Sequence, residues 1–191
     1  MKESRYKIKS ELNTTIALIT DTHNRKAAVA LQSLQRVASD LIAVAGDFVL
    51  GHRPQRRGSL LNCSMVEQQK NVLPFLSSCM AIAPTYVSLG NHEAFLREDD
   101  LEMIRATGVV LLDNTFVRAN WNLLIGGLSA GHVVDYREYR VRYYQENGDV
   151  IRYPSRSNKE LPKWYDVDDS WLSEFEKQEG YKILLSHHPE Y

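Results

Sequence analysis

Side chains that commonly bind metal ions follow four separate apolar stretches of the sequence. Asp21 and His23 come after IALIT, Asp47 after LIAVAG, Asn91 after YVSLG, and His187 after KILLS. Each stretch is too short for a helix and favours a buried strand. In an open α/β sheet the carboxyl ends of the strands line one crevice, so we expect these side chains to converge. Asp21 and His23 are two positions apart in an extended segment and can reach one ion together.

The donor atoms of this set point to a class of ion and a class of reaction. Carboxylates, imidazoles and an amide oxygen suit Mn, Fe or Zn better than ions that prefer thiolates. A carboxylate, for which we choose Asp47, can bridge two ions about 3.5 to 4 Å apart. Such a pair can generate hydroxide at neutral pH and neutralise phosphate oxygens during in-line displacement. The sequence therefore predicts hydrolysis of phosphate mono- or diesters by attack of a metal-bound hydroxide at a dinuclear site.

The elements that must position these residues alternate in the first part of the chain. Apolar runs predict strands at 14–20, 41–45, 85–89 and 109–112, and helical spacing predicts helices at 26–39, 59–78 and 99–107. Ser59 is a possible N-cap of the second helix, which Pro74 should end or kink. Gly46 and Gly90 each precede a proposed metal-binding residue, where the absence of a side chain would permit unusual dihedrals and close backbone approach to a ligand. The alternation indicates parallel strands with helices packed on the sheet faces.

The pattern changes after Asn114. Segments 115–119 and 122–128 are typical of two strands around a turn near Asn120, which favours an antiparallel pair in a mixed or second sheet. Residues 132–165 hold six of the ten tyrosines, interleaved with arginines, and we interpret them as an irregular insertion or lid. A helix at 169–178 and a buried strand at 182–186 follow. The 191 residues suit one domain.

The ordered motifs resemble those of the calcineurin-like metallophosphoesterases. The pattern of that family is DxH, GD, GNH followed by Asp or Glu, an isolated His, and GHxH. The matches in this chain are Asp21-Thr22-His23, Gly46-Asp47, Gly90-Asn91-His92-Glu93 and His187. An ordered set is far more specific than any single motif. The resemblance implies an α/β fold of two mixed β-sheets packed face to face and flanked by helices, as a four-layer sandwich.

The resemblance also implies a role for each matched residue. It assigns two overlapping ligand sets for two divalent ions: Asp21, His23 and Asp47 for one, and Asp47, Asn91 and His187 for the other. His92 would not bind metal but would contact the phosphate or the leaving group as a proton donor or electrophile. Glu93 would orient the neighbouring backbone or a ligand.

The chain departs from the family pattern in two places. After Gly46-Asp47 the protein Ser/Thr phosphatases carry Asp and Arg, whereas this chain has Phe48 and Val49, so it looks more like the bacterial-type branch that acts on small substrates. No GHxH follows His187, and that motif would supply one further histidine to each ion. We therefore expect the N-terminal portion of a longer protein, with the C-terminal part of the domain missing. The alternative is a non-catalytic binding or assembly module with an incomplete metal site.

Other residues near these motifs leave two interpretations open. His188 could contact substrate or be structural filler before Pro189, and His52 could bind a phosphate oxygen or be solvated. The Tyr/Arg stretch 136–153 could offer cations and ring faces to an anionic aromatic substrate. We prefer to interpret it as an exposed insertion whose amphipathic residues cover the core.

Net charge, the length of apolar stretches and the cysteine content limit the classes of partner and the cellular compartment that the sequence indicates. Lys+Arg 23 against Asp+Glu 24 gives a formal net charge of −1, so a nucleic-acid partner is not indicated. No stretch approaches the roughly 20 apolar residues of a membrane span, and no apolar stretch of signal-peptide length precedes the first strand. Cys63 and Cys79 lack CxxC spacing and are expected to be buried thiols in a reducing compartment. The sequence predicts a cytoplasmic protein with a small phosphorylated substrate.

Overall fold

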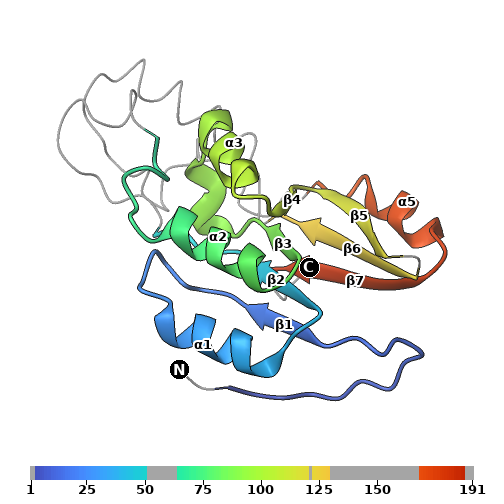
Figure 1. Cartoon of the computed structure of the whole chain (residues 1–191). Coiled ribbons are helices and arrows are strands. Elements are labelled where there is room, and N and C mark those ends of the chain that lie inside the picture. Colours follow the sequence, from blue (N-terminus) through green and yellow to red (C-terminus); the bar gives the residue numbers. More distant parts are fainter. Residues whose placement is uncertain (1–2, 51–63, 121, 130–167, 188–191) are drawn as a thin grey trace, which may run out of the picture.

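The computed structural model describes residues 3–50, 64–120, 122–129 and 168–187. Within these ranges the strands form one four-stranded and one three-stranded sheet (Figure 1). The predictions for His52, Cys63, His188 and the insertion at 132–165 concern residues outside the described ranges.

The first sheet is parallel and has the order β1-β2-β3-β4. Its strands are β1 (Ile16–Ile19), β2 (Leu41–Ala45), β3 (Thr85–Ser88) and β4 (Val110–Leu112). Every residue of β2 and β3 is buried, because parallel strands in the middle of a sheet are covered on both faces. The predicted parallel arrangement is confirmed, and the carboxyl ends of the strands lie along one edge.

Three helices connect these strands and cover one face of the first sheet. They are α1 (Ala28–Val37), α2 (Val72–Ile82) and α3 (Glu98–Ala106). Leu34, Phe75 and Ile104 from the three helices pack in one core with Ile42 and Val44 of β2. None of the helices in the described part of the chain is long and apolar enough to cross a membrane.

The helix predicted at 59–78 was wrong in its position. It begins at Val72 and continues to Ile82, while 64–71 form turns. Pro74 is the third residue of the helix, where a backbone N–H has no partner within the helix, so the proline neither ends nor breaks it. The buried residues at helical spacing extend past the predicted end: Val72, Phe75, Leu76 and Cys79.

The second sheet has the order β5-β6-β7 and is mixed. Its strands are β5 (Thr115–Asn120), β6 (Leu123–Leu128) and β7 (Tyr181–Ser186). β5 and β6 form the predicted antiparallel pair, and β7 runs parallel to β6. The pairing is therefore mixed in this sheet, whereas the described strands of the first sheet are all parallel.

Two hydrophobic cores arrange these elements in four layers (Figure 1). The second core joins Leu41 of β2 with Leu123 of β6 and Leu185 of β7, and so lies between the two sheets. Helix α5 (Leu172–Lys177) covers the outer face of the second sheet, where the rings of Phe116 and Phe175 are 5.2 Å apart. The expectation of two packed sheets flanked by helices is confirmed.

The first core encloses Cys79, whose thiol is free and fully buried. Burial raises the pKa of this thiol to about 12, so little thiolate forms even at pH 9. We predict that Cys79 in a Cys63→Ser variant resists alkylation by iodoacetamide between pH 7 and pH 9. After unfolding in guanidinium, one thiol per chain should react. Rapid alkylation of the native variant, measured by intact mass, would contradict this burial.

Candidate metal centre

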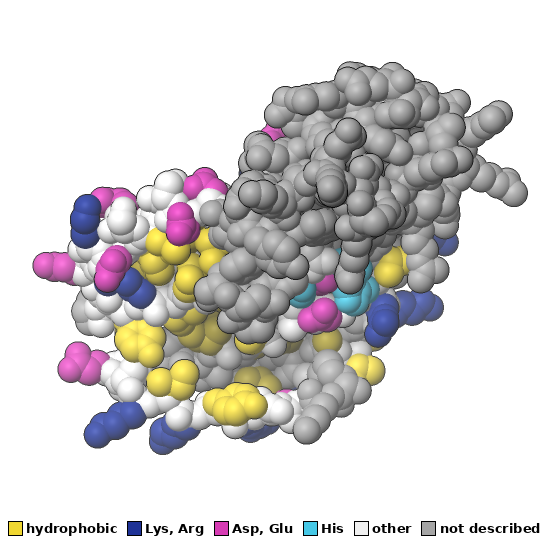
Figure 2. Space-filling view, turned by 180° about the vertical axis from the view of Figure 1, so that it is seen from behind, with side chains coloured by type: hydrophobic (Ala, Val, Ile, Leu, Met, Phe, Trp, Pro, Cys, Tyr) yellow, Lys and Arg dark blue, Asp and Glu magenta, His cyan; other side chains and the backbone are white. Residues whose placement is uncertain are grey.

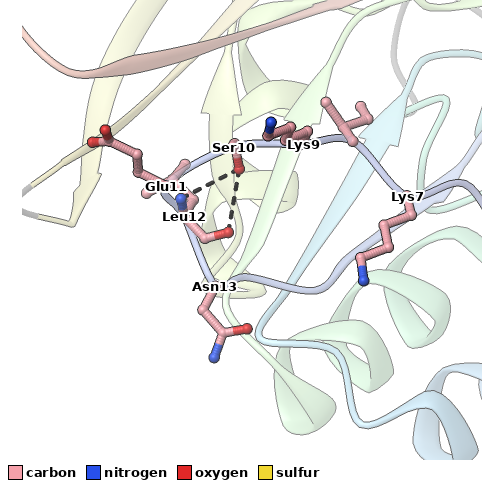
Figure 3. A pocket seen from close by; sticks show the side chains of 7 residues that line it. Lys7, Lys9, Ser10, Glu11, Leu12 and Asn13 are labelled. Atoms are coloured by element: carbon pink, nitrogen blue, oxygen red, sulfur yellow. Dashed lines mark hydrogen bonds between the residues drawn. The ribbon is translucent and has the colours of Figure 1, made fainter.

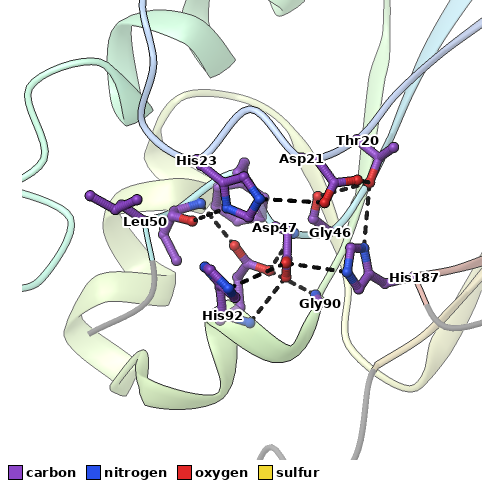
Figure 4. A network of polar contacts seen from close by, with 12 residues as sticks. Thr20, Asp21, His23, Gly46, Asp47, Leu50, Gly90, His92 and His187 are labelled. Carbon is purple, nitrogen blue, oxygen red and sulfur yellow. Dashed lines mark hydrogen bonds and ion pairs between the residues drawn. The ribbon is translucent and has the colours of Figure 1, made fainter. Parts of the chain in front are cut away.

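The loops that follow four strands meet at the carboxyl edge of the first sheet (Figure 4). Asp21 and His23 follow β1, and Asp47 follows β2. His92 belongs to the 3-10 helix η1 (Asn91–Phe95), which follows β3, and His187 follows β7. Because β7 belongs to the second sheet, both sheets contribute to one site. The predicted convergence of side chains from distant strands is confirmed for these residues.

The donor atoms form two groups that share Asp47. One group is Asp21, Asp47 and His187, and the other is His23, Asp47 and His92. Within each group the donor atoms all lie within 4.8 Å of one another. A carboxylate that belongs to both groups has the position a bridging ligand needs. The groups differ from the sets implied by the resemblance, in which Asp21 shares an ion with His23 and His92 binds no metal.

Asn91 stays a predicted ligand. It is the first residue of η1 and directly precedes His92. The backbone therefore brings it to the same edge as the other predicted ligands.

The ligand loops adopt left-handed backbone at several positions. The φ angles are 58° at Asp21, 46° at His23 and 54° at Asp47. Asp and His adopt this region more readily than most residues, but it persists only where the surroundings enforce it. Here the N–H of Asp21 donates to the Gly46 carbonyl (3.3 Å), and the N–H of His23 donates to the Asp47 carbonyl (3.0 Å). These bonds tie the loop after β1 to the loop after β2.

Gly46 and Gly90 allow the loops after β2 and β3 to touch. A Cβ on Gly46 would lie 2.6 Å from the Gly90 nitrogen, and a Cβ on Gly90 would lie 2.7 Å from the Asp47 nitrogen. Any side chain at either position would push the loops apart. The unusual dihedral expected at Gly46 is confirmed by its φ of 74°, while close approach of the backbone to a ligand stays a prediction.

Asp47 is the most buried of the clustered donor residues, with 3% of its surface exposed. Its Oδ1 accepts from the His92 N–H (3.0 Å), and its Oδ2 lies 3.2 Å from His187 Nε2. Burial alone would raise the pKa of Asp47, but the hydrogen bonds from His187 and from the His92 backbone outweigh burial and lower it. Asp47 is therefore ionised at neutral pH, as a metal ligand must be.

Backbone carbonyls orient two of the histidines. His187 Nδ1 lies 2.9 Å from the Ala45 carbonyl oxygen, and His23 Nδ1 lies 3.4 Å from that of Val49. An imidazole held through Nδ1 presents Nε2 to the site, which is how proteins often orient a metal-binding histidine. The hydrogen bond with Asp47 raises the pKa of His187 to about 9. A divalent ion bound by both side chains would take the place of that proton.

His92 is held differently. Its Nδ1 is buried and has no hydrogen-bond partner among the described residues. Its Nε2 is 3.7 Å from Asp47 Oδ2, and its ring centroid is 4.5 Å from that of His23. A buried nitrogen without a partner is costly and suggests that a ligand completes the site. The shared carboxylate, the oriented imidazoles and this nitrogen together fit divalent ions and an oxyanion.

Glu93 joins the loop after β2 to the loop after β3. It is fully buried; Oε2 accepts from the N–H groups of Asp47 and Gly90, both at 2.7 Å, and Oε1 accepts from Val49 at 2.9 Å. Burial, together with the charge of Asp47, raises the pKa of Glu93 to about 7, although the three N–H groups oppose the shift. The predicted role in orienting neighbouring backbone is confirmed, although the sequence did not indicate these three bonds.

On the face shown in Figure 2, the visible histidine side chains lie close together, next to acidic side chains. A separate hollow is lined by Lys7–Asn13, where Ser10 Oγ contacts only the Leu12 backbone among the lining residues (Figure 3). These residues precede β1 and come from one stretch of chain, so they do not share the convergence of the metal centre. The carboxyl edge of the first sheet is therefore the stronger candidate for a functional site.

Comparison with known proteins gives a match over most of the chain. The sequence model of the family described as calcineurin-like phosphoesterase matches residues 14–191. This range includes every residue of both donor groups. No curated protein matches the chain.

Proposed function

Because the chain belongs to the calcineurin-like phosphoesterase family, we propose that it is a metal-dependent phosphohydrolase that cleaves mono- or diesters of small phosphorylated substrates at a dinuclear site. The observation that carries the proposal is the membership of Asp47 in both groups of donor atoms. The bacterial-type branch and a cytoplasmic location are part of the proposal and rest on the sequence alone.

In this proposal the metal ions and the residues around them have different roles. Two bound divalent ions would lower the pKa of water and neutralise the charge on phosphate oxygens. Asp47 would hold both ions, and Asn91 would complete the ligand set of one of them. The loops around them are fixed by backbone hydrogen bonds, which keeps the ligands in place for the reaction.

His92 donates a proton to the leaving oxygen. Its side chain is 32% exposed, so it can meet a substrate, whereas that of Asp47 is 5% exposed. Its Nδ1 has no hydrogen-bond partner among the described residues, so this nitrogen is available to a substrate. Mn, Fe and Zn are the proposed ions, because the ligands are carboxylate, imidazole and amide.

The assay that tests the function uses generic aryl phosphate mono- and diesters with the metal-free protein. Added Mn²⁺ should restore hydrolysis, and EDTA should remove it. Mass spectrometry of the metal content should give two ions per chain. A protein that binds no Mn²⁺ and hydrolyses neither ester would instead favour the non-catalytic module.

The His92→Ala variant separates the two possible roles of this histidine. We predict that it still binds two Mn²⁺ ions but hydrolyses the aryl esters about 10² to 10⁴ times more slowly, the usual contribution of general acid catalysis. The loss should be smallest for esters with the most acidic leaving group, which need little protonation. Loss of one ion together with activity would make His92 a ligand, as the group with His23 allows.

A further inference from the structure

Two asparagines fasten the segment that carries His23 to the start of α2. The Asn71 backbone N–H donates to Asn24 Oδ1 (2.9 Å), and Asn71 Nδ2 donates to the Asn24 carbonyl oxygen (2.7 Å). Asn71 directly precedes α2, but its side chain does not cap that helix. We call this closed pair of hydrogen bonds the asparagine clasp.

The clasp holds a strained part of the backbone. His23 and Asn24 are successive residues with φ of 46° and 53°. Both types tolerate left-handed backbone, but two in succession need support from their surroundings. The Asn24 N–H also donates to the Phe48 carbonyl (2.9 Å), so the clasp fastens a residue that is already bound on its other side. Without the clasp, this pair loses one of its supports, which lets the His23 ring shift relative to Asp47.

Other bonds hold the group of donor atoms formed by Asp21, Asp47 and His187. Thr20 Oγ1 lies 2.8 Å from Asp21 Oδ2 and 3.0 Å from the Ala45 carbonyl oxygen. The same carbonyl accepts from His187 Nδ1 (2.9 Å). These bonds do not involve either residue of the clasp. Loosening the clasp should therefore disturb His23 and leave Asp21 and His187 in place.

We propose that Asn24 and Asn71 are positioning residues that hold His23 for one of the two metal positions, an inference that rests on the proposed two-metal function. Neither asparagine belongs to the family motifs in the sequence. Their effect is specific to one ion because only one donor group contains His23.

Isothermal titration of the full chain with Mn²⁺ alone tests this role. We expect Asn71→Ala to weaken by about 10-fold the binding of the ion that His23→Ala also weakens, because residues that orient a ligand usually change metal affinity by about 10- to 100-fold. The affinity for the other ion should stay within a factor of two of wild type. Asn24→Gly keeps access to positive φ but removes Oδ1, so it should weaken the same ion.

Asn114→Ala is the matched control. Asn114 also has left-handed backbone (φ 50°), and its Oδ1 accepts from the Ser129 N–H (2.9 Å), but it follows β4 at the far end of the first sheet from β1. It should lower the melting temperature without changing either Mn²⁺ affinity. If wild type binds no Mn²⁺, the proposed function and the clasp both fail. If wild type binds Mn²⁺ and Asn71→Ala either binds both ions as tightly as wild type or binds both of them equally weakly, only the clasp is overturned.

Discussion

Asp47→Asn should abolish both tight Mn²⁺ binding and phosphoesterase activity. The asparagine keeps the size of the side chain and an oxygen that can accept from the His92 N–H. It loses the charge and the second acceptor oxygen, which lies 3.2 Å from His187 Nε2. Because Asp47 belongs to both donor groups, the change should affect both ions. Metal-assisted stabilisation of the transition state is worth several kcal/mol, so activity should fall by about 10³-fold or more.

The measurement combines metal content per chain with the rate of aryl ester hydrolysis at saturating Mn²⁺. Asp40→Asn is the control, since it removes the same charge from the opposite end of β2, where Asp40 accepts from the Thr15 N–H (2.7 Å). The control should keep two ions and near wild-type activity. An Asp47→Asn protein that retains two tightly bound ions would rule out Asp47 as the bridge.

Most of the site could be predicted from the sequence because parallel strands place their carboxyl ends together. The apolar runs located β1, β2, β3 and β7, and the polar residues after the first three then had to lie at one edge of the first sheet. No long-range contact had to be known for these three strands, whereas the position of His187 after β7 depends on the packing of the second sheet against the first. The parallel pairing of the first sheet and the antiparallel β5-β6 pair were also predictable, because the alternation of strands with helices, the strand lengths and the turn residues are local signals.

The start of α2 was not predictable from the same kind of signal. Apolar residues before Val72 continue a helix-like spacing. Met65 and Val66 are indeed buried, but they lie in turns and not in a helix. Asp100 of α3 holds these turns by accepting from Ser64 Oγ (2.6 Å) and the Val66 N–H (3.0 Å). A contact across 34 residues therefore overrode the local pattern.

The extended backbone expected for Asp21 and His23 was wrong, while their sharing of one ion stays a prediction. Asp21 and His23 were expected to share an ion because residues two apart in an extended segment point the same way. The positive φ values at both positions show that this segment is not extended. Their side chains remain close, at 3.4 Å, yet fall in different donor groups. Loop conformation, set by hydrogen bonds to the loop after β2, decides which ligands meet.

Glu93→Ala should destabilise the protein more than any change at an exposed residue. It would leave the N–H groups of Asp47, Val49 and Gly90 without their acceptor in a fully buried place. Each unsatisfied buried group costs about 1 to 3 kcal/mol, so the free energy of unfolding should fall by about 3 kcal/mol or more. For a chain of this size, that corresponds to a melting temperature lower by about 6 to 12 °C.

Thermal unfolding followed by circular dichroism measures this loss, with Glu102→Ala on the exposed face of α3 as the control. The control should melt within about 2 °C of wild type, since surface changes are usually worth less than 0.5 kcal/mol. Glu93→Gln should lie between them, because its single carbonyl can replace Oε2 toward Asp47 and Gly90 while its amide meets the Val49 N–H donor to donor. Mn²⁺ affinity should fall in the same order, from Glu102→Ala through Glu93→Gln to Glu93→Ala. The reason is that the three N–H groups belong to the loops that position Asp47. If Glu93→Ala melts like the control, the buried carboxylate does not join these loops, and the rigidity of the metal centre must come from the backbone alone.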